Sequence, residues 1–298
     1  MRNHNDNNIK QAVRDWWASN PMTYGFEHGV TGYVHEDGTV VNVEIGSREF
    51  FDFADKTFYG WNTAKHDETG YFGKIFDYAR YAGKPVLEVG CGMGCMAMNW
   101  AQHGAQITAV DLNPTSVEVT KRRFEIYGLS GDIRESDGEN LPFKNDTFDY
   151  VYSWGVLHHS PNAKKSIGEL FRVLKPGGKV GVMLYHRDSM MYRFLVDYVE
   201  GFLHMEDEFL SDIELASRYG DGERQEGNPY TWPVTKREVH RDLFQKYKNV
   251  QIDILGTELV FIFNQWFPNL GTKLPKRLMD VCIRNWGWSL WITAEKPS

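Results

Sequence analysis

Apolar and polar positions follow two alternating periods through the middle of the chain. Short runs rich in Val, Ile, Leu and Tyr have the length and composition of buried strands, and the stretches between them carry apolar residues at helical spacing. The expected strands cover residues 85–89, 106–110, 132–136, 148–153 and 178–185. The expected helices cover residues 93–103, 114–127 and 161–174, the last two after the capping pairs Asn113-Pro114 and Ser160-Pro161. This alternation predicts an α/β fold in which a parallel sheet carries helices on both faces.

A different pattern precedes this part of the chain. Its apolar residues fall first at helical spacing, then alternate around Asp37-Gly38, and then return to helical spacing. The expected elements are a helix at 9–20, a hairpin at 33–45, and helices at 48–58 and 68–81. We therefore expect residues 1–83 to form an N-terminal helical lid placed before a main domain of residues 84–298.

The strand–helix rhythm also stops after residue 185. Residues 188–217 are helical in pattern and aromatic, and residues 219–232 form a loop with Gly, Asn and Pro. A capping box at Thr235–Glu238 then opens another helix, and strands return at 250–255 and 288–294. We expect residues 186–245 to be a C-terminal helical insertion that caps the substrate side of the main domain.

Composition narrows the classes of function. Lys and Arg number 33 against 40 Asp and Glu, and the net charge of −7 argues against a protein built to bind nucleic acid. No apolar run approaches the length of about 18 residues that a spanning helix needs, so no stable membrane insertion is expected. The polar N-terminal sequence has no apolar segment of a secretory signal. Three cysteines are too few for a disulfide framework and have no partners for a metal site, so we expect a cytoplasmic protein that binds no metal.

A basic amphipathic segment near the C-terminus has two interpretations. Its cations are Lys273, Lys276, Arg277 and Arg284. They could contact an anionic membrane or an acidic partner. In a chain of net negative charge, a solvated helix face is the simpler interpretation.

The strongest chemical signal is the glycine-rich turn after the first strand of the main domain. It reads Val86-Leu-Glu-Val-Gly-Cys-Gly-Met-Gly94 and joins a strand to a helix. Glycines at such a turn let a ligand approach the backbone, and the helix N-terminus favours negative charge. Asp111 follows the second strand, where a carboxylate can accept hydrogen bonds from ribose hydroxyls. A nucleotide cofactor is therefore expected, and because Gly92, Gly94 and Ala97 also satisfy a G-x-G-x-x-A pattern, the turn alone does not exclude nicotinamide.

Further motifs follow this turn in a fixed order. They are Asp111, SDGENLPF at 136–143, FDYVYSWGVLHH at 148–159 and LKPGG at 174–178. With the glycine turn, they resemble the class I S-adenosylmethionine-dependent methyltransferases, particularly the small-molecule branch that includes the ubiquinone and menaquinone methyltransferases. The resemblance is strong over residues 84–185 and weak over the terminal strands. It implies a Rossmann-like, seven-stranded sheet and S-adenosyl-L-methionine as the cofactor.

The resemblance also implies which residues bind this cofactor. The turn would hold the methionine moiety and the ribose, Asp111 the ribose hydroxyls, and Asp137 the adenine amine. Leu112 would pack on the adenine, and the end of the fourth strand would lie beside the sulfonium, whose charge suits aromatic faces. The implied cofactor contacts are Glu88, Gly90, Cys91, Gly92, Gly94, Asp111, Leu112, Asp137, Gly138, Ser153 and Trp154.

The methyl-acceptor side is less defined by the sequence. His158 follows the fourth strand and is a candidate base, because an imidazole with a pKa of about 6.5 can take a proton from an O–H or N–H group. A structural role for His158 is equally compatible with its position, and His159 is the weaker candidate base and a candidate substrate contact.

Three consecutive residues leave the last parallel strand toward the same face. Of these, His186 is a second candidate catalytic residue and Tyr185 a candidate substrate contact. Arg187 could hold a carboxylate or phosphate of the substrate, although a surface ion pair also explains it. Tyr24, in the lid, is a further candidate substrate contact.

These observations predict an enzyme that moves a methyl group to an oxygen, nitrogen or carbon atom of a small, partly apolar metabolite. One alternative is C-methylation of an alkene or prenyl substrate through a carbocation, which aromatic side chains would stabilise. Another is a cofactor-binding partner protein without turnover. The sequence leaves the oligomeric state open, a homodimer included.

Overall fold

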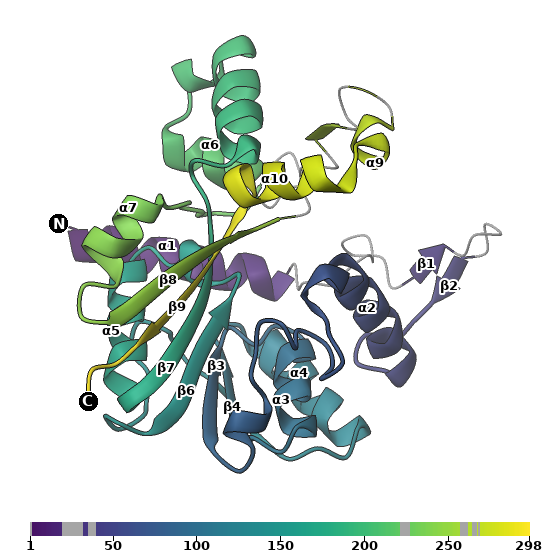
Figure 1. The fold of residues 1–298 in the computed structure, drawn as a ribbon, viewed down its shortest axis with the longest axis vertical. Coiled ribbons are helices and arrows are strands. Elements are labelled where there is room, and N and C mark those ends of the chain that lie inside the picture. The colour runs from purple at the N-terminus through teal and green to yellow at the C-terminus, as the bar shows by residue number, and fades with distance from the viewer. Residues whose placement is uncertain are drawn as a thin grey trace.

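A seven-stranded sheet forms the centre of the molecule, with strand order β5-β4-β3-β6-β7-β9-β8 (Figure 1). The computed structural model describes residues 2–19, 32–34, 40–220, 227–256, 262–263, 267 and 269–298. The strands are β3 (Pro85–Val89), β4 (Gln106–Asp111), β5 (Asp132–Glu135), β6 (Phe148–Trp154), β7 (Leu174–Tyr185), β8 (Lys248–Leu255) and β9 (Ser289–Glu295). β3 to β7 pair in parallel, and β9 runs antiparallel between β7 and β8. The predicted Rossmann-like, seven-stranded fold is confirmed.

Burial explains why the central strands read as continuous apolar runs. Val86, Leu87, Val180 and Val182 are fully buried because helices cover both faces of the sheet. β8, at the edge, alternates between more and less exposed positions instead, as expected where one face meets solvent.

Helices flank this sheet on two sides (Figure 1). α3 (Cys95–Gln102) and α4 (Pro114–Ile126) lie on one side, and α5 (Ala163–Val173) and α7 (Lys236–Glu238) lie on the other. Asn113 caps α4 as predicted, since its side chain accepts a hydrogen bond from the Thr115 amide. The predicted Ser160 cap of α5 is wrong: Asn162 caps this helix, and the Ser160 hydroxyl donates to Glu139 at 2.7 Å.

The N-terminal part contains the predicted first helix, hairpin and second helix. These are α1 (Arg2–Ser19), β1 (Gly32–Val34) paired antiparallel with β2 (Val40–Asn42), and α2 (Arg48–Trp61). The predicted helix at 68–81 is wrong, because the only helical element in this range is a short 3-10 turn at Ala79–Tyr81. The Asp67 carboxylate accepts from the amide of Thr69 at 2.9 Å, which stabilises a turn, and Phe72 has a left-handed φ of 59° that a helix cannot continue.

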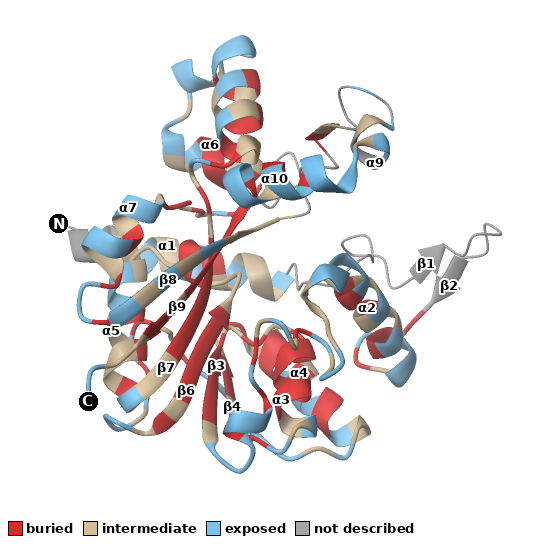
Figure 2. Cartoon of the chain, in the orientation of Figure 1, coloured by how far each residue is buried: buried red, intermediate tan, exposed pale blue. Residues whose placement is uncertain are grey.

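The C-terminal helices project from the sheet as a second layer of structure. They include a π-helical segment η4 (Met191–Leu203), α6 (Asp212–Tyr219), α9 (Leu270–Lys273) and α10 (Lys276–Trp286). Figure 2 shows buried residues concentrated along the sheet and a mixture of buried and exposed ones on this projection. In the part of the chain that the structure describes, no helix combines the length and apolar character needed to cross a membrane.

Candidate functional site

A cavity of about 440 Å³ lies at the carboxyl ends of the parallel strands, where ligands bind in sheets of this kind. Its wall is formed by the turn after β3, the ends of β4, β6 and β7, the segment 136–139, and helices α1 and α2. Most of the predicted cofactor residues line it: Glu88, Gly90, Cys91, Gly92, Asp111, Leu112, Asp137, Gly138 and Trp154. Of the predicted substrate contacts, His159 and Tyr185 line it as well. The structure therefore places the predicted cofactor residues and two predicted substrate contacts in one cavity, although up to about 100 positions separate them in the sequence.

The glycine turn has a backbone that only glycine adopts easily. Gly90 has a φ of +84°, and a Cβ there would lie 2.2 Å from Val156. A Cβ on Gly92 would meet no atom within 4 Å, so the backbone of Gly92 borders open space in the cavity wall. Gly94 begins α3 but is outside the wall; a Cβ there would lie 2.7 Å from Thr120. The turn is thus shaped to bring a ligand against its backbone.

Asp111 is held in place by two amides. Its Oδ2 accepts from the Gly92 amide and its Oδ1 from the Asn113 amide, each at 2.9 Å. Burial raises the pKa of Asp111, and these amide bonds oppose that shift. Each carboxylate oxygen has a second lone pair, so the group can still accept hydrogen bonds from ligand hydroxyls.

Glu88 presents a buried acceptor in the cavity wall. Its side chain is 2% exposed, and Oε2 has no hydrogen-bond partner among the described residues. Burial raises the pKa of Glu88 well above its usual range. A buried acceptor of this kind is satisfied by a ligand that donates to it, most strongly by a cationic donor.

Helix α1 covers one end of the cavity, and the sequence had singled out none of its residues as site residues. The Lys10 ammonium lies 2.7 Å from both Asp137 and Glu139, and Asn113 donates a hydrogen bond to the carbonyl of Trp17. Lys10 and Trp17 share one helical face with Val13 and Arg14, and all four line the cavity. These four residues are spaced i, i+3, i+4 and i+7, and this spacing was the sequence pattern that could have identified the face of α1 that lines the cavity.

Aromatic rings form a further part of the wall. Tyr185 stacks on Trp288 with centroids 4.5 Å apart, and Trp17 meets His159 edge-on at 5.4 Å. Trp154 also lines the cavity. The sequence did not single out Trp17 or Trp288 as site residues, because each reaches the cavity only through packing of distant elements.

The two adjacent histidines after β6 are placed differently. His158 is 1% exposed, lies outside the wall, and stacks on Tyr185 with ring centroids 3.7 Å apart. Neither of its ring nitrogens has a hydrogen-bond partner among the described residues, and burial lowers the pKa of His158 well below its usual value. His159 lies in the wall.

The surroundings of His159 determine which of its nitrogens carries the hydrogen. Nδ1 lies 3.0 Å from the Tyr230 carbonyl, which can only accept, and 3.1 Å from the Thr231 hydroxyl. The Thr231 hydroxyl donates its own hydrogen to Asn228 at 2.8 Å. Nδ1 must therefore be the donor, and in a neutral ring Nε2 is then the basic nitrogen.

The remaining predicted residues lie outside the cavity wall or outside the described residues. His186 has its Nδ1 3.1 Å from the Gly287 carbonyl, which ties it to the segment after α10, and burial lowers its pKa. Ser153 donates to the Val89 carbonyl at 2.7 Å and joins β6 to β3. Tyr24 falls outside the described residues.

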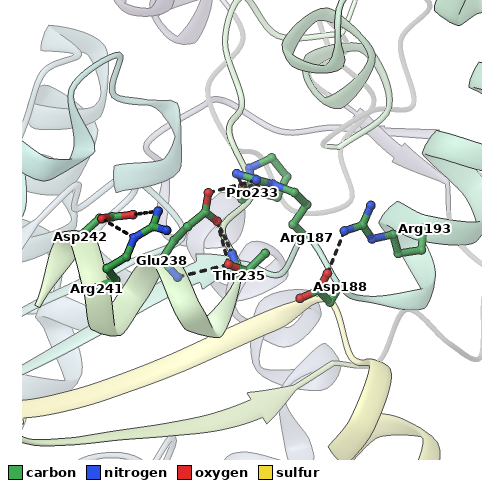
Figure 3. Close-up of polar contacts among 8 residues, drawn as sticks. All are labelled: Arg187, Asp188, Arg193, Pro233, Thr235, Glu238, Arg241 and Asp242. Carbon is green, nitrogen blue, oxygen red and sulfur yellow. Dashed lines mark hydrogen bonds and ion pairs between the residues drawn. The ribbon is translucent and has the colours of Figure 1, made fainter.

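Arg187 is held by protein groups, as Figure 3 shows. Its guanidinium donates twice to the Pro233 carbonyl, pairs with Glu238 at 3.1 Å and lies over Trp232 at 4.0 Å. Its guanidinium thus serves the loop that leads into α7 and α7 itself, and it does not line the cavity. Of the two roles predicted for Arg187, the ion pair agrees with this geometry better than a contact with a substrate carboxylate or phosphate.

Comparison with known proteins gives consistent matches to the central part of the chain. Residues 87–182 match a family model described as a methyltransferase domain. Over 119 residues, 39% of this chain, the sequence is 34% identical to a phthiotriol/phenolphthiotriol dimycocerosates methyltransferase of Mycobacterium leprae, of which the match covers 43%. Over 45% of this chain it is 33% identical to a ubiquinone biosynthesis O-methyltransferase of Nitrosospira multiformis, of which it covers 56%. The chain thus spans about half the length of these relatives.

The fold agrees with these matches. The structure of Haemonchus contortus phosphoethanolamine N-methyltransferase 2 in complex with S-adenosyl-L-methionine superposes with a TM-score of 0.53 at 16% identity, over 87% of this chain and 62% of that chain. A likeness at this identity establishes the shared fold. Residues 87–182 are thus similar to a methyltransferase domain, and the sheet that contains them has the Rossmann-like, seven-stranded fold of class I methyltransferases.

Proposed function

We propose that this protein is an enzyme that transfers a methyl group from S-adenosyl-L-methionine to a small, partly apolar acceptor. The observation that carries the proposal is the pairing, in one cavity, of the unpartnered Glu88 oxygen with the amide-anchored Asp111 carboxylate. When bound, the cofactor supplies a methyl group on a cationic sulfur.

The cavity residues fit this cofactor chemically. Glu88 would accept from the cofactor's ammonium, Asp111 from its ribose hydroxyls, and Asp137 from the adenine amine. The rings of Trp154 suit the neighbourhood of a cationic sulfur. These roles rest on the acceptor capacity of each carboxylate, since every one of the three lines the cavity.

We propose His159, rather than His158, as the base that accepts the acceptor's proton. His159 lines the cavity, and its Nδ1 is fixed as a donor to the Tyr230 carbonyl, so Nε2 is the nitrogen able to take a proton. His158 does not line the cavity, and it would act as the support on which the Tyr185 ring stacks. Positioning of the acceptor would supply most of the rate enhancement, and removal of its proton would add a smaller part.

The acceptor is proposed to be an oxygen or nitrogen nucleophile on a molecule with apolar surface. The aromatic wall of Trp17, Tyr185 and Trp288 supports this, as do relatives named for a dimycocerosate lipid and for ubiquinone biosynthesis. A cytoplasmic location is part of the proposal, because all three cysteines are free thiols, as expected in a reducing compartment.

Isothermal calorimetry with S-adenosyl-homocysteine tests cofactor binding. Asp111→Ala should weaken the affinity about 10- to 100-fold, because charge-assisted hydrogen bonds are lost, whereas Asp132→Ala, at an exposed position of β5, should leave it unchanged. Absence of binding at millimolar concentration would show that the proposal is wrong.

Turnover needs a separate experiment. Incubation with methyl-labelled cofactor and a metabolite extract, followed by mass spectrometry, should yield a labelled small molecule. Cofactor binding without any labelled product would favour the alternative of a non-catalytic partner protein.

A further inference from the structure

Helix α10 combines an exposed basic stripe with exposed apolar side chains. Arg277, Val281 and Arg284 follow one another at i, i+4 and i+7, so they share one face, and all three are exposed. Leu278, one turn before Val281, is 48% exposed, and Val281 is 44% exposed. Scattered exposed apolar residues need no explanation, but a group on one short helix next to cations does.

The opposite face of α10 is already used. Met279 and Cys282 are buried against Met190 and Phe194 at the start of the projecting helical part. The outward face is therefore the one left for another partner. In Figure 2 this helix shows exposed residues along its length, next to buried ones.

The charge of this segment is opposite to that of the whole chain. Between residues 273 and 286 there are four cations and one acid, Asp280, in a chain of net charge −7. Arg284 donates only to the backbone carbonyl of Asp280, and none of the four cations forms an ion pair within the described part of the chain. A local surplus of this kind complements a negatively charged surface.

The position of α10 connects this surface with the cavity. Gly287 follows the helix directly and is fixed by His186, and Trp288, the next residue, lines the cavity. Leu255 and Gly256, at the end of the neighbouring strand β8, also line it. The aromatic end of the cavity thus lies immediately beside the end of α10.

We propose that α10 docks on an anionic lipid surface, with Arg277 and Arg284 at the headgroups and Leu278 and Val281 inserted at the interface. Amphipathic helices with cations beside apolar side chains bind membranes in this way without crossing them. Docking would place the aromatic end of the cavity next to the lipid, where an apolar acceptor is concentrated. The delivery of an apolar acceptor to the cavity rests on the proposed function, whereas the binding of α10 to lipid does not.

Cosedimentation of the full chain with lipid vesicles tests the proposal. The chain should bind vesicles of phosphatidylglycerol and phosphatidylcholine, bind vesicles of phosphatidylcholine alone far less, and be released by salt. Each Lys or Arg near an anionic surface contributes about fivefold to binding, so Arg277→Gln with Arg284→Gln should lower it roughly 25-fold. The matched control, Lys164→Gln with Lys165→Gln, removes two exposed cations of α5 and should have little effect.

A second pair of variants separates the apolar contribution. Leu278→Ser with Val281→Ser should also weaken binding to the anionic vesicles. Equal binding to both vesicle types, no binding to either, or equal losses in the α5 control would overturn the proposal. Calorimetry with S-adenosyl-homocysteine on each variant shows that the fold is intact, and it distinguishes failed docking from failure of the proposed function.

Discussion

The ammonium of Lys10 lies 2.7 Å from Oδ2 of Asp137 and equally close to Oε2 of Glu139. Both carboxylates line the cavity, and Lys10 belongs to α1. The contact holds the first helix across the part of the cavity where we propose that adenine binds. Lys10 would therefore hold the helix closed over bound adenine, which links opening of the helix to exchange of the cofactor.

Removing this ammonium should accelerate cofactor exchange. A half-buried ion pair is worth about 1 kcal/mol, so Lys10→Ala should raise the dissociation rate of S-adenosyl-homocysteine roughly fivefold. Stopped-flow tryptophan fluorescence measures that rate, since Trp17 lines the same cavity. Gln11→Ala, on the exposed side of α1, is the matched control and should not change the rate. An unchanged rate in Lys10→Ala would mean that α1 does not restrain the cofactor.

Turnover should depend on His159 and much less on His158. His159→Asn keeps a donor for the Tyr230 carbonyl but has no basic nitrogen, so kcat should fall about 10²- to 10⁴-fold. The rise of kcat with pH that a base produces should also disappear. His158→Phe preserves the stack on Tyr185 and should retain most of the activity.

If kcat falls more in His158→Phe than in His159→Asn, His158 is the catalytic base. Steady-state kinetics from pH 6 to 9 on both variants decides between the two. A loss confined to KM in His159→Asn would assign this residue to acceptor binding alone.

The sequence predicted the elements whose signals are local. The turn at Gly90–Gly94 and the cap at Asn113 depend on residues close in the chain, and the structure contains both. The roles of His158 and His159 could not be separated in this way, because a short 3-10 turn at Leu157–His159 decides which ring faces the cavity. Arg187 could not be assigned either, because Pro233 and Glu238, which hold it, are about 50 residues away.

The predicted helix at 68–81 failed for a related reason. Phe72, Phe76 and Tyr78 are all buried, so their apolar spacing reflects real packing. The turn at Asp67, however, holds this segment in a non-helical path. Burial and helix formation produce the same apolar pattern over a short stretch, and the pattern alone does not distinguish them.

His158 should make the fold sensitive to mild acid. Burial lowers its pKa in the folded state below the value of about 6.5 expected in the unfolded chain, so the unfolded state binds more protons under acid. Protonation of His158 does not reduce the free energy of unfolding well above about pH 6.5. Below that pH, the free energy of unfolding should fall by up to about 1.4 kcal/mol per pH unit. Urea unfolding at pH 7.5 and 5.5 should show a smaller loss in His158→Phe than in the wild type. Equal losses would show that this ring does not cause the sensitivity.

A buried ion pair between Asp55 and Arg123 should be needed both for stability and for the cofactor turn. Arg123 is fully buried, lies 2.7 Å from Asp55, and donates at 2.7 Å to the carbonyl of Met93 within the glycine turn. Arg123→Met would leave the Asp55 charge and the Met93 carbonyl without their partner. Loss of one member of such a pair costs about 3–5 kcal/mol of unfolding free energy. Urea unfolding measures this cost, and calorimetry should show a weaker affinity for S-adenosyl-homocysteine.

The neighbouring residue provides a control for this prediction. Arg122 is on the same helix, is 60% exposed and pairs with Glu125 at 3.3 Å, so Arg122→Ala should change the stability by less than about 1 kcal/mol. If Asp55→Leu is combined with Arg123→Met, the unpaired charge is removed, and part of the lost stability should return. An Arg123→Met variant as stable as Arg122→Ala would show that the ion pair does not hold α2 and the glycine turn together.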